Sequence, residues 1–119
     1  MQDDLKKDNL IVQLTFDFAL SAVSFCAVLD SLRKWSLSNQ LLRASLSIGA
    51  NVKEAQNAES KADFVHKMKI AAKEADEVEF YLEVCNRSEN LPNCEDLIGK
   101  AQAICRVLNK IIASSKSKI

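Results

Sequence analysis

The residue types that could carry out catalytic or metal chemistry are few in this chain. It contains one histidine, His66, and four cysteines, Cys26, Cys85, Cys94 and Cys105. No cysteine pair has the Cys-x-x-Cys spacing of a zinc or redox site, and no His-x-x-x-His, Glu-x-x-His or glycine-rich phosphate loop occurs. Because helical spacing places the histidine outward and three of the cysteines within helices, we expect a solvated imidazole and buried, reduced thiols. The sequence therefore predicts no catalytic residue, no metal ligand and no cofactor.

A second group of polar residues has two interpretations. Asn51 interrupts an apolar seam between Ile48 and Ala55, and Glu54, Lys73, Glu74 and Glu79 lie on the same helix or on the next one. As a functional group these residues would form a binding site. As a structural group, Asn51 would be buried and hydrogen-bonded to a neighbouring helix, fixing the register at some cost in stability. We favour the structural interpretation, because a polar group in an apolar seam must be hydrogen-bonded whatever the function.

Charge is balanced overall but not along the molecule. There are 16 basic and 16 acidic residues, so the formal net charge is zero and no global signal for nucleic-acid binding is present. In an antiparallel arrangement, however, the basic residues gather at one end. From this set we take as candidate nucleic-acid ligands Lys53, Lys67, Lys69, Lys73, Arg106 and Lys110. The alternative is ordinary helix-dipole complementarity on solvated faces.

Hydrophobic spacing predicts the elements that must position these residues. Two glycines and one proline leave few helix breakers, so 119 residues fit a single all-α domain, an up-and-down antiparallel four-helix bundle. Apolar residues recur at steps of three and four along four segments. We predict helices over 15–34, 37–58, 61–87 and 94–115, with loose tails at 1–8 and 114–119.

Polar residues at the segment starts suggest helix caps. Thr15, Ser36, Ser60 and Asn93 can each accept a hydrogen bond from a first-turn amide, and Asp63 can bond back toward Ser60.

The apolar seam of the third predicted helix is the most regular of the four. It consists of Phe64, Met68, Ala71, Ala75, Val78, Leu82 and Cys85.

Two apolar surfaces remain outside these seams. The first helix has no charged residue from Phe18 to Leu29, too short a stretch to span a bilayer, which takes about 20 residues. A helix that is apolar nearly all round must be buried nearly all round, so we expect self-association and no membrane. The predicted interface residues are Leu20 and Val23 on the first helix and Ile70, Phe80 and Val84 on the third.

Several local motifs together resemble a known family. They are Ser47–Ala55 (SIGANVKEA), Gln40-Leu41-Leu42-Arg43, Ser60-Lys61-x-Asp63-Phe64 and Ile70-Ala71-x-Lys73-Glu74-Ala75. The chain is thereby similar to the bacterial four-helix-bundle proteins encoded in intervening sequences of 23S ribosomal RNA, to which accessory proteins of diversity-generating retroelements are related. The resemblance covers the whole chain in length and layout.

The resemblance implies a homopentamer and, through the retroelement relatives, a link to nucleic acid and to a nucleic-acid-processing partner. Our first hypothesis is therefore a non-enzymatic, oligomeric bundle that binds RNA, DNA or such a partner electrostatically. The alternative is a purely structural or protein-interaction bundle without a nucleic-acid role. The charged start, MQDDLKKDN, lacks a signal-peptide pattern, so we expect a cytoplasmic protein.

Overall fold

Four helices pack around one hydrophobic core. The computed structural model describes residues 2–117, with side chains described from 10 to 116, and within that range there is no strand. The helices are α1 (Gln2–Ser31), α2 (Trp35–Ala55), α3 (Lys61–Arg87) and α4 (Glu95–Ser117). They form a rod of 48 × 22 × 21 Å. The predicted all-α, four-helix arrangement is confirmed.

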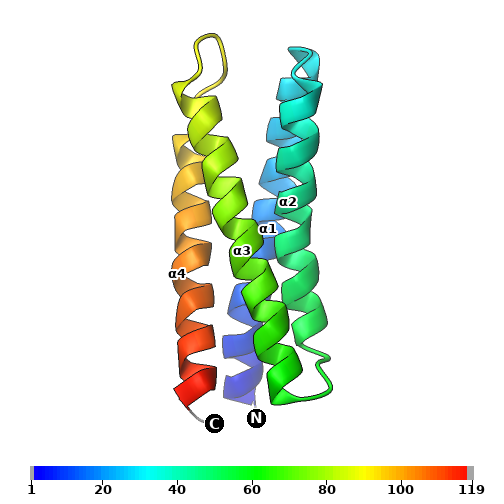
Figure 1. The fold of residues 1–119 in the computed structure, drawn as a ribbon, viewed down its shortest axis with the longest axis vertical. Helices are drawn as coiled ribbons and strands as arrows, with labels where there is room; N and C mark the ends of the chain where they lie inside the picture. The colour runs from blue at the N-terminus through cyan, green and yellow to red at the C-terminus, as the bar shows by residue number, and fades with distance from the viewer. Residues whose placement is uncertain (1, 118–119) are drawn as a thin grey trace.

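Each helix contacts the next in the chain, and α4 also contacts α1, which closes the bundle. Figure 1 shows the start of α1 and the end of α4 at the same end as the α2–α3 turn. We call this the basic end. The α1–α2 turn and the α3–α4 loop lie at the opposite end, which we call the acidic end.

The helix bounds differ from the predicted ones mainly at the start of the chain. α1 begins at Gln2 rather than at residue 15, and it includes the residues 2–8 expected to be loose. Thr15 does not cap a helix, because it lies inside α1, 1% exposed, and its hydroxyl donates to the Ile11 carbonyl at 2.8 Å. Apolar spacing continues upstream of it, since Ile11 is buried in the core. At the other terminus α4 continues to Ser117.

Of the four predicted caps, Ser60 and Asn93 are present, whereas Thr15 and Ser36 cap no helix. The Ser60 hydroxyl accepts from the Asp63 amide at 3.0 Å, which caps α3. The Asp63 carboxylate accepts from the amide of Glu59, one residue before the cap, at 3.2 Å, and not from Ser60 as expected. Asn93 accepts from the Glu95 amide at 2.8 Å at the start of α4. Ser36 is wrong as a cap, because the N-cap position of α2 is Lys34, without a side-chain hydrogen bond.

The predicted apolar seams agree best with the observed burial in the middle of the chain. All of the predicted α3 seam is buried except Phe64, which is half-buried. In α2 the seam runs through Val52, fully buried, and not through its neighbour Asn51. Both positions satisfy a seam of threes and fours, and the bundle buries the apolar one because burying an amide costs free energy.

α1 leaves a large apolar surface uncovered. Its Leu10–Ser31 stretch, 22 residues with a mean hydropathy of 1.8, is long and apolar enough to cross a membrane, unlike the shorter Phe18–Leu29 run noted in the sequence, and only 28% of its most apolar part is buried. Core helices of soluble proteins and N-terminal signal sequences have the same length and composition. The exposed side chains include Phe16, Leu20 and Val23. In the single chain these side chains are exposed to solvent, and an exposed apolar patch of this kind is typical of an interface.

Candidate nucleic-acid interface

Two lysines meet near the basic end, on neighbouring helices. Lys69 of α3 lies beside Lys116 of α4, and the positive charge of the Lys116 ammonium lowers the pKa of Lys69. Neither lysine forms an ion pair with a carboxylate among residues 10–116. Two like charges held together without a counterion form a local positive centre that favours an anion. Lys116 lies in the segment that was predicted to be a loose tail.

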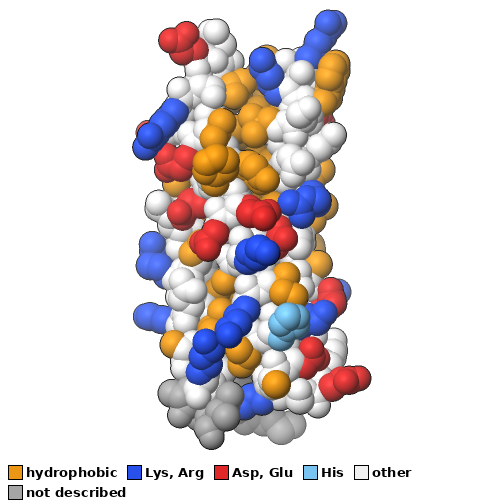
Figure 2. All heavy atoms as spheres, in the orientation of Figure 1, with side chains coloured by type: hydrophobic (Ala, Val, Ile, Leu, Met, Phe, Trp, Pro, Cys, Tyr) orange, Lys and Arg blue, Asp and Glu red, His pale blue; other side chains and the backbone are white. Residues whose placement is uncertain are grey.

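Three more of the six candidate cations lie on the same two helices as this pair. Lys73 is exposed on α3, and Arg106 and Lys110 are exposed on α4, again without ion pairs in the described part of the chain. Figure 2 shows Lys and Arg side chains gathered over the lower parts of α3 and α4. The face formed by Lys69, Lys73, Arg106, Lys110 and Lys116 is hereafter the basic face.

The other two candidates lie apart from the basic face. Lys67 points toward α2 and forms an ion pair with Glu54 at 3.0 Å, so its charge is compensated. Lys53 lies at a hollow between α1 and α2. Sequence spacing predicted that all six cations lie at one end of the bundle. It could not predict on which side of the bundle each cation lies, because the side depends on which helices are neighbours.

Carboxylates cluster on α3 toward the acidic end. Arg43 of α2 forms ion pairs with Glu74 at 3.5 Å and with Glu77 at 3.2 Å. The Glu74 Oε2 atom is buried and has this ion pair but no hydrogen bond among the described residues. The Arg43 guanidinium is exposed, so this pair of contacts contributes little to stability. The cluster leaves this part of α3 with one cation for two carboxylates, and phosphate is therefore disfavoured there.

The polar residues of the seam have structural partners. Asn51 is half-buried, not buried as expected, and its amide donates to Ser47 of its own helix, to the carbonyl at 2.9 Å and to the hydroxyl at 3.1 Å. The expected bond to a neighbouring helix is therefore wrong. Glu54 joins α2 to α3 through Lys67. Glu79 is half-buried on α3, where its charge raises the pKa of Cys105.

The cysteines are protected thiols. Burial raises the pKa of Cys26 and Cys94, and it raises the pKa of Cys85 and Cys105 to about 11. The Cys94 thiol donates to the Leu82 carbonyl at 3.1 Å. A thiol with a raised pKa is a poor nucleophile at neutral pH. Among the described residues, no three His, Cys, Asp or Glu side chains are grouped so as to hold a metal ion.

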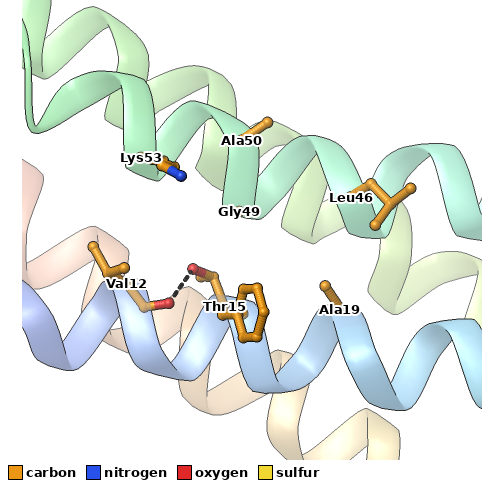
Figure 3. A pocket seen from close by; sticks show the side chains of 8 residues that line it. Val12, Thr15, Ala19, Leu46, Gly49, Ala50 and Lys53 are labelled. Carbon is orange, nitrogen blue, oxygen red and sulfur yellow. Dashed lines mark hydrogen bonds between the residues drawn. The ribbon is translucent and has the colours of Figure 1, made fainter.

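A small apolar hollow of about 230 Å³ opens between α1 and α2. Figure 3 shows Thr15 and Ala19 of α1 facing Leu46 and Lys53 of α2 across it, with Gly49 presenting no side chain. Phe16 also lines the hollow and is 59% exposed. The hollow was not anticipated from the sequence. A glycine inside a helical pattern was its only local signal.

The predicted interface residues lie on two separate faces. Leu20 and Val23 are exposed on α1, while Phe80, at 65%, and Val84 are exposed on α3. Ile70, nearly three turns before Phe80 on the same helix, is half-buried and lies apart from them. The Phe80 ring packs edge-to-face on Tyr81, with centroids 5.9 Å apart. α1 and α3 are not neighbours in the bundle, so the two apolar faces point in different directions.

Comparison with known proteins agrees with this architecture. The family model of the 23S rRNA-intervening sequence protein matches residues 7–110. A crystal structure of a protein of unknown function from the S23 ribosomal protein family of Bacteroides thetaiotaomicron is 37% identical, with a TM-score of 0.85, and the match covers 90% of this chain and 98% of that one. No curated protein matches the chain. The chain therefore belongs to the 23S rRNA-intervening sequence protein family.

Proposed function

We propose that this chain is a non-enzymatic, cytoplasmic, self-associating helix bundle whose basic face binds nucleic-acid phosphates, with RNA as the first ligand to test. The observation that carries the proposal is the basic face itself, five exposed cations of α3 and α4 that form no ion pair among residues 10–116. A phosphate backbone laid along this face would meet several uncompensated positive charges. The family name and the retroelement relatives support RNA or DNA, or a protein that processes them, as the partner.

The binding expected from such a face is weak and strongly salt-dependent. With zero net charge, the protein has no long-range attraction for nucleic acid beyond about a Debye length of 8–10 Å, so the local cations must supply the affinity. Self-association would multiply the contacts. Repeating one basic face around a ring converts a few weak contacts per chain into a larger positive surface.

Self-association is supported by the two exposed apolar faces, one on α1 and the other on α3. Because the faces differ, a contact between them is heterologous and closes into a ring when the rotation between subunits allows it. The family resemblance suggests a homopentamer. The uncovered surface of α1 and the exposed Phe80 are the features that a neighbouring subunit would bury.

A second candidate is a protein-interaction bundle without a nucleic-acid role. It is favoured by Phe80, which between residues 10 and 116 is the most exposed of the large apolar side chains, next to the carboxylates Glu77 and Glu83 on the same helix. An aromatic side chain at the centre of a polar rim is typical of a protein interface. In this case the partner would carry an apolar pocket rimmed by basic groups.

Binding of labelled RNA at about 50 mM salt separates the candidates, since phosphate contacts are strong there. Neutralising both members of the pair, Lys69→Gln with Lys116→Gln, should weaken retention and reduce the slope of log K against log salt by roughly 1.4–1.8, the sum of two phosphate contacts. The matched control is Arg33→Gln with Lys34→Gln, two exposed cations at the acidic end. Absence of wild-type binding, or equal losses in both double variants, would reject the basic face.

A further inference from the structure

The hollow between α1 and α2 has the size and lining of a socket for one aromatic side chain. Its volume is about 230 Å³, and a cavity of about 150 Å³ already holds a benzene molecule. Gly49 leaves it open, although a Cβ there would meet only ordinary contacts with Thr15, so the packing of α1 against α2 does not require a glycine. Phe16 and Leu46, both exposed, form its walls (Figure 3).

The rim of the hollow carries one uncompensated positive charge. Lys53 lines the hollow, is exposed, and forms no ion pair among residues 10–116. The carboxylate of Asp17 accepts from Gln13 and lines a separate hollow on the α4 side, so it does not neutralise Lys53. A side chain that enters the hollow is therefore favoured if it brings a carboxylate with it.

Phe80 has these surroundings on the outer side of α3. Its side chain is 65% exposed, and Asp76, one helical turn before it, is exposed as well. Asp76 forms no ion pair within residues 10–116, and its carboxylate accepts only a long hydrogen bond, 3.9 Å, from the Cys105 thiol. The other carboxylates one turn away, Glu77 and Glu83, are already paired with arginines. An exposed phenyl ring thus lies beside one unpaired carboxylate.

A single chain cannot bring these two features together. The hollow lies between α1 and α2, whereas Phe80 is on α3, which does not contact α1. Phe80 is in the last third of α3, toward the acidic end, and Gly49 is in the last third of α2, toward the basic end. The ring that fills the hollow must therefore come from another copy, which is inclined to the first or displaced along it.

We infer that the hollow receives the Phe80 ring of a second copy of this chain, with Lys53 paired to Asp76 of that copy. This inference rests on the self-association in the proposed function, and it names the side chains that make the contact. Phe16 at the wall gives the entering ring an aromatic neighbour. Because every copy has one hollow and one exposed ring, the contact repeats head to tail.

The decisive experiment mixes two variants that each lack one half of the contact. Gly49→Leu fills the hollow and keeps Phe80, whereas Phe80→Asp removes the ring and keeps the hollow. Each variant alone should lose the oligomer mass in light scattering coupled to size exclusion. Their equimolar mixture should form a particle of about 26 kDa, twice the 13.2 kDa of one chain, because one intact contact remains between them. Gly99→Leu makes the same change at an exposed glycine of α4 and should keep the wild-type mass.

Charge exchange tests the ion pair through exposed side chains alone, so it remains decisive if Gly49→Leu does not fold. Lys53→Glu and Asp76→Lys should each raise the dissociation constant of the oligomer about fivefold. The two changes in one chain should restore it, because the opposite charges meet again. Lys53→Glu combined with Glu89→Lys, at an exposed position of the α3–α4 loop, has the same net charge and should restore nothing.

The outcomes separate this inference from the proposed function. If Phe80→Asp lowers the mass but Gly49→Leu does not, or if the mixture stays at the mass of one chain, another surface covers the hollow. The inference is then wrong and self-association stands. A wild-type particle of one chain rejects both, and the hollow is then left to a different partner. Binding of RNA to the basic face is decided separately by the Lys69 and Lys116 double variant.

Discussion

Ser38 and Ser45 lie two turns apart on the same buried face of α2, yet only Ser38 is hydrogen-bonded. The Ser38 hydroxyl donates to the Cys26 carbonyl of α1 at 3.2 Å, and the Cys26 thiol donates back to the Ser38 carbonyl at 3.6 Å. The Ser45 hydroxyl, in a residue with no exposed surface, has no partner among the described residues. One serine thus links two helices, and the other is a desolvated polar group.

The two serines should respond oppositely to alanine. Ser38→Ala should lower the free energy of unfolding by about 0.5–1.5 kcal/mol, because it removes a buried hydrogen bond. Ser45→Ala should be neutral or stabilising, because it removes an unsatisfied hydroxyl and introduces a better helix former. Urea unfolding of both variants measures the difference, and equal destabilisation would contradict the assigned bonds.

The cap at Ser60 predicts a local effect on α3. Ser60→Ala should cost about 0.5–2 kcal/mol, since the Asp63 amide loses its acceptor. Ser60→Asp should restore most of the loss, because a carboxylate at this position also accepts from the amide and suits the helix dipole. Ser36→Ala is the control at a serine that caps nothing, and thermal melts should show a change within about 0.5 kcal/mol.

Gly49 and Gly99 should both be replaceable by alanine with a gain in stability. A Cβ at Gly49 meets ordinary contacts, and a Cβ at Gly99 in α4 meets nothing within 4 Å. Each substitution should raise the free energy of unfolding by about 0.5–1 kcal/mol. Denaturant melts test this, and a loss at Gly49 alone would show that the helices need to approach more closely there.

Alkaline pH should destabilise the protein through Cys85. Burial raises the pKa of this thiol from 9.0 to about 11, so the folded state holds its proton where the unfolded chain releases it. The contribution is complete below pH 9, and it should decline between pH 9 and 11 by up to about 2–3 kcal/mol. Urea titrations across this range should show a shallower decline for Cys85→Ala than for the wild type, although that variant is less stable at neutral pH.

Phe80 tests the proposed self-association. Phe80→Asp should lower the mass of the particle in light scattering coupled to size exclusion, because a carboxylate would be desolvated against a neighbour's apolar surface. Gln102→Asp introduces the same charge at an exposed polar position on α4 and should leave the mass unchanged. A wild-type mass near the 13.2 kDa of one chain at micromolar concentration would exclude self-association under those conditions.

The sequence alone determined the elements that depend on local spacing. The α3 seam from Met68 to Cys85 could be predicted because only one register of threes and fours buries its apolar residues. The cap at Ser60 could be predicted because its partner, Asp63, is three residues away. The number of helices and their antiparallel order followed from the few breakers, but the first turn lies at 32–34 and not at 35–38 as expected.

Tertiary structure decided what depends on neighbours far away in the chain. Asn51 and Val52 fit the α2 seam equally well on spacing, and the choice between them was made by the helices packed against α2. Six cations were expected at one end, but contacts between helices directed Lys67 to Glu54 and Lys53 to the hollow, and they set Lys69 against Lys116. Spacing along one helix fixes which residues share its face, whereas the partner of that face is set only when all four helices bury their apolar surfaces together.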